Sequence, residues 1–225
     1  MKIACITYRN WAIEIYELLE NQFSGSHNFL VLKSKKEFDS QKLISFNPDL
    51  ILWYGWSWMV EDLFVDKYNS IMLHPSPLPK YRGGSPIQNQ IINGEKSSCV
   101  TLFKMTKNLD DGDIYKQLPF SLNGSLNQIF DRIITLGYSA TAEIIDNNFE
   151  LTKQDHNKVT FCKRRRPEDS EISLSELTEA TGQYLHNKIR MLNDPYPNAY
   201  IKTSDNKKTL FNRFQTRKIM SKNLL

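Results

Sequence analysis

The chain has 225 residues, enough for one large domain or for a domain with a smaller appendage. Its composition, 40% hydrophobic and 24% charged, excludes collagen-like, coiled-coil and mostly disordered chains. A formal net charge of +4 indicates a nucleic-acid partner only if the basic residues are clustered. The cysteines are three, with no metal-ligand spacing, and no apolar run reaches eighteen residues. We therefore expect a cytoplasmic protein with no membrane partner.

Short strands and helices alternate along the first part of the chain. We expect strands at 2–8, 29–32, 50–53 and 70–73, and helices at 11–23 and 35–46. The segment 50–53 is apolar throughout, which indicates a strand buried on both faces, as in a parallel sheet. The alternation predicts an α/β fold, with a Rossmann-like open, mostly parallel twisted sheet and flanking helices.

The pattern changes after residue 98, where two strands are separated by a loop alone. Ser125 and Gln128 have the spacing of a capping box, which predicts the start of a long helix ending at Ile145. The other elements expected here are strands at 99–104, 114–120, 196–201 and 208–214 and a helix at 175–192. We divide the chain into a core domain, 1–150, and a small C-terminal appendage of helices and a β-hairpin, 151–225.

The segment 74–88, HPSPLPKYRGGSPIQ, is typical of a ligand-binding loop. His74 directly follows a strand, so it lies at the carboxyl edge of the sheet, where open α/β sheets bind ligands. Prolines stiffen the loop, and Ser85 and Pro86 are expected to cap and open a helix. A rigid loop that leads into a helix N-terminus predicts an oxyanion or phosphate site, although the P-loop pattern is absent.

The segment 108–113, NLDDGD, places three carboxylates around one glycine. A solvated turn is the simplest interpretation, and the Glu that an EF-hand needs at its twelfth position is missing. A carboxylate close to His74 would, however, stabilise the imidazolium form of that ring. The two segments together predict an acid–base site.

These two segments resemble the folate-dependent formyltransferases. Members of that family act on methionyl-tRNA, on glycinamide ribonucleotide or on nucleotide-linked amino sugars. Their H-x-S-x-L-P-x-x-R-G loop corresponds here to residues 74–83, and their D-x-G corresponds to residues 110–112. Weaker likeness at 49–60 and 186–199 extends the resemblance over most of residues 1–215.

The resemblance implies His74 and Asp110 as catalytic residues and 10-formyltetrahydrofolate as the formyl donor, with no metal. It implies a donor-binding set and an acceptor-binding set. The donor set is Trp56, Trp58, Met59, Val60, Leu109 and Asp110. The acceptor set is Ser76, Tyr81, Arg82, Gly83, Gly84 and Gln88. The neighbouring Trp53 is expected to belong to the core.

Met72 departs from the family pattern, which has an asparagine two residues before the histidine. That asparagine donates a hydrogen bond to the formyl oxygen, and a thioether has no proton to donate. Either another donor, such as a backbone N–H near Gly84 or a water, replaces it, or the protein is slow or inactive. A degenerate folate or sugar-nucleotide binding module is therefore an alternative to an enzyme.

The acceptor amine is a second open point. Family members that act on tRNA carry a further C-terminal barrel and exceed 225 residues, whereas residues 74–95 are similar to the pseudaminic-acid type of sugar-nucleotide N-formyltransferase. We expect a UDP- or dTDP-linked amino sugar as the small-molecule partner and no nucleic acid. A homodimer is left open as the oligomeric state. A carrier-bound or tRNA-bound aminoacyl amine is the alternative. The basic run 163–166 is interpreted as a solvated linker, or else as a nucleic-acid patch or a diphosphate contact.

Overall fold

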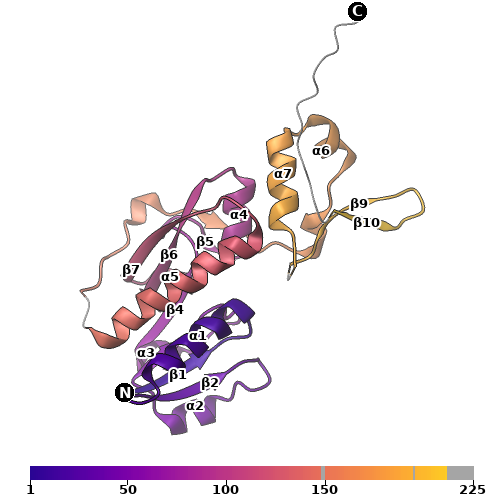
Figure 1. Ribbon diagram of the computed structural model, residues 1–225. Helices are drawn as coiled ribbons and strands as arrows, with labels where there is room; N and C mark the ends of the chain where they lie inside the picture. Colours follow the sequence, from indigo (N-terminus) through magenta and orange to yellow (C-terminus); the bar gives the residue numbers. More distant parts are fainter. Residues whose placement is uncertain (148–149, 195, 212–225) are drawn as a thin grey trace, which may run out of the picture.

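The computed structural model describes residues 1–147, 150–194 and 196–211. Six strands form the central sheet in the order β2-β1-β3-β4-β6-β7, and β1 to β4 are parallel to one another (Figure 1). The other two strands are antiparallel to their neighbours. The strands are β1 (Lys2–Ile6), β2 (Asn28–Leu32), β3 (Leu50–Leu52), β4 (Ser70–His74), β6 (Ser97–Lys104) and β7 (Ile114–Ser121). This arrangement confirms the predicted mostly parallel α/β sheet.

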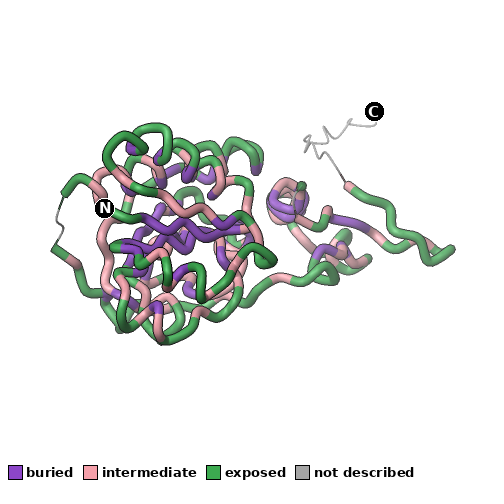
Figure 2. The backbone as a smooth tube through the Cα atoms, turned by 90° about the horizontal axis from the view of Figure 1, so that it is seen from below, coloured by how far each residue is buried: buried purple, intermediate pink, exposed green. Residues whose placement is uncertain are grey.

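Alternating residues of β1 show how the sheet is covered on both faces. Ile3 and Cys5 pack in one cluster with residues of α1 (Asn10–Phe23) and α5 (Leu126–Asp146). Ala4 and Ile6 pack on the opposite face with Leu43 of α2 (Ser40–Phe46) and a residue of α3 (Asp62–Asp66). Successive side chains of a strand point to opposite faces, so an entirely apolar strand requires these two helical layers. Figure 2 shows the resulting buried centre of the core domain.

A buried tyrosine defines where β3 ends. The hydroxyl of Tyr16 donates to the carbonyl of Leu52 (2.8 Å) and accepts the N–H of Tyr54 (2.8 Å). Trp53 lies between them, is fully buried, and donates its indole N–H to the hydroxyl of Ser70 (3.1 Å). The prediction that Trp53 belongs to the core is confirmed. The chain after Tyr54 is then free to line the edge of the sheet.

The helix predictions are confirmed in part. The capping box of Ser125 and Gln128 opens α5 as expected. The helix expected at 35–46 begins only at Ser40, because the carboxylate of Asp39 accepts the N–H of Gln41 and caps it there. The helix expected at 175–192 is two helices, α6 (Leu174–Glu179) and α7 (Gly182–Met191). The hydroxyl of Thr181 accepts the N–H of Tyr184 and starts the second helix.

The C-terminal part contains a segment that stays on the core and an appendage that projects from it (Figures 1 and 2). Thr152 pairs with Ile114, and β8 (Phe161–Cys162) pairs with β5 (Arg82–Gly83) of the loop 74–88. The boundary at residue 150 stays a prediction. The other elements are α4 (Pro86–Ile92), the 3-10 helices η1 (His156–Lys158) and η2 (Pro167–Ser170), and the hairpin β9 (Ala199–Lys202) and β10 (Lys208–Phe211).

Two of the remaining sequence predictions concern the end of the chain and membranes. The first hairpin strand starts at Ala199 rather than 196, and the end of the second, 212–214, lies outside the described residues. Within the described ranges, no helix is long and apolar enough to cross a membrane.

Replacing Gly137 tests the contact between α1 and α5. A Cβ at Gly137 would lie 2.8 Å from methyl carbons of both Ile15 and Leu73. We expect Gly137→Leu to lower the free energy of unfolding by about 1–3 kcal/mol, because it overpacks the core. Urea denaturation measures the change. Gly25→Ala is the control, since nothing lies within 4 Å of a Cβ there; equal stability of the two variants would contradict the expectation.

Candidate active site

A cavity of about 730 Å³ opens where the carboxyl ends of three parallel strands meet. Its wall includes Arg9, which follows β1, residues 55–60, which follow β3, and His74 at the end of β4. This edge of an open α/β sheet is where ligands bind, and the volume lies in the range of small-molecule sites. The strand ends therefore place the predicted catalytic histidine in the wall of a pocket.

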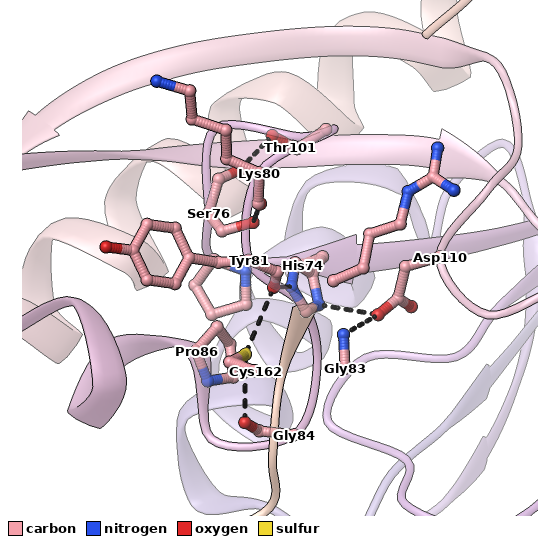
Figure 3. Close-up of polar contacts among 12 residues, drawn as sticks. His74, Ser76, Lys80, Tyr81, Gly83, Gly84, Pro86, Thr101, Asp110 and Cys162 are labelled. Carbon is pink, nitrogen blue, oxygen red and sulfur yellow. Dashed lines mark hydrogen bonds and ion pairs between the residues drawn. The ribbon is translucent and has the colours of Figure 1, made fainter. Parts of the chain in front are cut away.

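The ring of His74 is held by a backbone carbonyl. It is 6% exposed, and its Nε2 lies 2.8 Å from the carbonyl oxygen of Tyr81 (Figure 3). A carbonyl can only accept, so Nε2 carries a proton. The other ring nitrogen, Nδ1, lies 3.6 Å from Oδ2 of Asp110. Because this distance exceeds that of a hydrogen bond, Nδ1 is not committed to the carboxylate and can face a ligand.

Asp110 lies in a turn that presses against β6. Its φ of +49° is in the left-handed region, which non-glycine residues seldom adopt. Oδ2 of Asp110 accepts the N–H of Gly83 (2.8 Å), so the turn is bonded to the loop 74–88. Gly112 approaches the carbonyl of Lys104 so closely that a Cβ would lie 1.6 Å from its oxygen. The structure thus brings together the two segments from which the sequence predicted an acid–base site.

The predicted acceptor-binding residues divide into two groups. Gly83, Gly84 and Gln88 line the cavity, and Nε2 of Gln88 is buried with no hydrogen-bond partner among the described residues. The remaining three lie off the described wall and support the loop. Ser76 donates to the carbonyl of Lys80 (2.8 Å), Tyr81 donates to Glu95 (2.9 Å), and the guanidinium of Arg82 is buried against Gln154 and Asp111. Their role toward a substrate stays a prediction.

Part of the cavity wall is aromatic and apolar. Trp56 is 8% exposed, and its ring lies 4.7 Å from that of Trp58, centroid to centroid. Tyr8 packs against Trp58 at the same distance. The predicted donor-binding residues all line the cavity, namely Trp56, Trp58, Met59, Val60, Leu109 and Asp110. Met59 is 91% exposed, which places it at the rim.

Met72 also lines the cavity, on the strand that carries His74. The two residues are two positions apart and point to the same face of the sheet. The wall therefore presents a thioether, with no proton to donate, beside the histidine.

Three arginines also line the cavity, namely Arg9, Arg164 and Arg165. Residues 163, 164 and 166 are exposed, as a solvated linker would be, and Arg164 and Arg165 also line the cavity, so the linker and the diphosphate contact both stay predictions. The N–H of Arg165 donates to the hydroxyl of Ser85 (3.1 Å), and Nε of Arg165 is buried without a partner among the described residues. Ser85 precedes α4 as expected, but its φ of +53° and this bond leave the helix without the predicted side-chain cap.

Two residues near the site were not found from the sequence. Arg9 follows a predicted strand at the edge where ligands bind, and that position was the available signal. Its guanidinium stacks on the ring of Tyr8 (4.5 Å to the centroid). Gln154 lies far from either motif and has no sequence signal. Among the described residues, no group of three or more His, Cys, Asp and Glu side chains is placed to hold a metal ion.

Comparisons with known proteins agree with this geometry. A family profile described as formyl transferase matches residues 20–145. Methionyl-tRNA formyltransferase of Lactobacillus gasseri is 32% identical over 198 residues, which are 83% of this chain and 62% of that protein. A methionyl-tRNA formyltransferase structure from Clostridium thermocellum has a TM-score of 0.88 and 28% identity, over 96% of this chain and 94% of that one. A 4-N formyltransferase from Francisella tularensis shares the fold (TM-score 0.77, 19% identity, 96% and 98% covered).

The profile covers more than half of the chain, so the chain belongs to the formyl transferase family. The resemblance stated from residues 74–88 and 108–113 is thereby confirmed. The chain spans about three fifths of the length of the curated relatives it matches.

The thiol of Cys162, beside the loop 74–88, gives a pH-dependent prediction. Sγ of Cys162 lies 3.2 Å from the carbonyl oxygen of Gly84, and burial raises the pKa of the thiol from 9.0 to about 11. The thiolate fraction at pH 8 is then about a hundredfold lower than for an ordinary cysteine. We expect slow alkylation of Cys162 by iodoacetamide at pH 8 and faster alkylation as the pH rises, measured by mass spectrometry. Rapid modification at pH 8 would contradict this account.

Proposed function

We propose that the protein is an N-formyltransferase that moves the formyl group of 10-formyltetrahydrofolate to the primary amine of a nucleotide-linked amino sugar. The arrangement of His74 carries the proposal. One ring nitrogen is fixed by the carbonyl of Tyr81, and the other faces both Asp110 and the cavity. This places a proton donor and a carboxylate in the wall of a cavity that also presents aromatic side chains and arginines.

The aromatic and apolar side chains of the cavity wall fit the donor. The pterin is a flat aromatic group, and Trp56 and Trp58 supply aromatic surface beside the catalytic pair. Met59 at the rim and Leu109 from the turn extend this surface. These residues would hold the donor so that its formyl group lies next to His74. When bound, the donor supplies a formyl carbon that a neutral amine can attack.

The catalytic pair then has two tasks. Negative charge grows on the formyl oxygen as the amine attacks, and a proton on Nδ1 of His74 is placed to stabilise it. Asp110, 3.6 Å from Nδ1 of His74, directly or through a water takes the proton that the amine must lose and passes it to N10 of the donor. The bond between the formyl carbon and N10 then breaks, and tetrahydrofolate leaves. Neither task requires a covalent bond to the protein.

The arginines of the cavity wall fit an acceptor that carries phosphate. Arg9, Arg164 and Arg165 supply positive charge, and a phosphate oxygen would satisfy the unpartnered Nε of Arg165. An aminoacyl-tRNA amine is the second candidate, since curated relatives that the chain matches are named for methionyl-tRNA.

A panel of acceptors tests the proposed function. We would incubate the protein with 10-formyltetrahydrofolate and UDP- or dTDP-linked amino sugars, with methionyl-tRNA as a separate arm, and detect the formylated amine by mass spectrometry. Transfer to a sugar nucleotide supports the proposal. Transfer to methionyl-tRNA alone would replace the acceptor, and folate binding without transfer to any acceptor would support the binding-module alternative.

Substitution of the catalytic pair gives a direct prediction. We expect His74→Ala and Asp110→Asn each to lower kcat by about 100-fold or more, because each removes a group that stabilises charge or moves a proton. The folate Kd, measured by tryptophan fluorescence, should stay within about threefold of the original value in His74→Ala, and folate binding should stay measurable in Asp110→Asn, which alters a predicted donor-binding residue. His27→Ala, a histidine outside the cavity, is the control. Rates close to those of the unmodified protein in either variant would rule out the assignment.

Met72→Asn is expected to raise activity. A donor to a developing oxyanion contributes roughly 3–4 kcal/mol in other enzymes, and an amide at position 72 would lie beside His74. We predict an increase of about tenfold or more in kcat, measured in the same transfer assay. Met72→Gln, with a longer side chain, is the comparison. An unchanged kcat in Met72→Asn would show that another group already serves the formyl oxygen.

A further inference from the structure

A single buried amide connects the Asp110 turn to the catalytic loop. Gln154 is 5% exposed and comes from the segment that returns to the core after α5. Its Nε2 donates to the carbonyl oxygens of Asp110 (3.0 Å) and Gly112 (2.7 Å), on either side of the turn. Its Oε1 accepts two hydrogen bonds from the guanidinium of Arg82, from Nε (3.2 Å) and from an Nη (2.7 Å). All the hydrogen-bonding capacity of Nε2 is used, and Oε1 accepts twice.

Arg82 links Gln154 back to the Asp110 turn. Its second Nη lies 2.7 Å from Oδ1 of Asp111, the residue next to Asp110. Burial by itself would raise the pKa of Asp111, but the hydrogen bond from Asn108 and the charge of Arg82 lower it below its usual value. Asp111 is thus held as a carboxylate. The residue after Arg82 is Gly83, whose N–H is the donor to the carboxylate of Asp110.

The turn needs such support. Asp110 has a positive φ, a backbone state that costs free energy and persists only where surrounding contacts enforce it. One carbonyl bound by Gln154 belongs to Asp110 itself, and the other belongs to Gly112, two residues further on. Without the amide, the turn could relax and move the Asp110 carboxylate relative to Nδ1 of His74.

We propose that Gln154 is a positioning residue for the reaction, which fixes the Asp110 carboxylate at its distance from His74 through the Asp110 turn and Arg82. This inference rests on the proposed catalytic role of Asp110. Gln154 itself does not line the described part of the cavity, so it acts through Asp110. A shorter amide cannot reach the turn and Arg82 at once, and a carboxylate would face two carbonyl oxygens.

Gln154→Asn is the test variant and Gln154→Leu the second. We expect kcat to fall by about 100-fold while KM for the folate donor stays within about threefold, because residues 56–60 of the donor wall are untouched and the Asp110 carboxylate is misplaced. In an Asp110→Asn background, Gln154→Asn should cost less than about threefold, since its partner in the reaction is already lost. A kcat near that of the unmodified protein, or an equal loss in both backgrounds, would overturn the proposal.

Hydrogen exchange supplies a readout that does not depend on activity. The N–H of Gly83 donates to Asp110, so its exchange should speed up about tenfold or more in Gln154→Asn. Thr141→Val on α5 is the matched control. It removes a buried hydroxyl that bonds the hydroxyl of Tyr54 and the carbonyl of Gly137. Unchanged Gly83 exchange, or the same rise in the control, would contradict the positioning role. If the unmodified protein transfers no formyl group, the proposed function fails, and Gly83 exchange still decides whether Gln154 fixes the turn.

Discussion

The hydrogen bond from Nε2 of His74 to the carbonyl of Tyr81 is the interaction on which the site depends. It assigns the proton on one ring nitrogen and thereby leaves the other to serve Asp110 and the cavity. The carbonyl can point at the ring because Tyr81 has a φ of +60°, and the loop is anchored by Ser76 and by pairing with β8. A loop held this firmly can keep one imidazole in one orientation before any ligand arrives.

The sheet supplies the other half of this arrangement. Three parallel strands end at one edge, so Arg9, Trp56 and His74 reach the same cavity although they are far apart in the chain. The antiparallel strands β6 and β7 then bring the Asp110 turn back beside β4. Backbone contacts fix most of the site, since Gly83, Gly112 and the carbonyls around Asp110 define its geometry. Side chains supply its charge.

The sequence predicted the parts of the molecule that depend on local patterns. Alternating apolar segments were sufficient for the sheet, and the position of His74 after a strand was sufficient to place it at the ligand-binding edge. Helix starts were missed at Ser40 and Gly182, where a capping side chain stops the periodic pattern from extending. For Arg165 the sequence left a diphosphate contact as one of three alternatives. Gln154 could not be assigned, because its contacts arise only when the segment after α5 folds back across the loop. Long-range contacts of this kind leave no periodic trace.

The protonation state of His74 tests the central claim most directly. Long-range 15N–1H spectra of protein labelled with 15N-histidine, assigned with His74→Gln, show which ring nitrogen carries hydrogen. The account predicts that the neutral ring carries its hydrogen on Nε2, which donates to the carbonyl of Tyr81. A neutral ring protonated on Nδ1, with Nε2 bare, would contradict it, because no hydrogen bond to the carbonyl of Tyr81 could then exist.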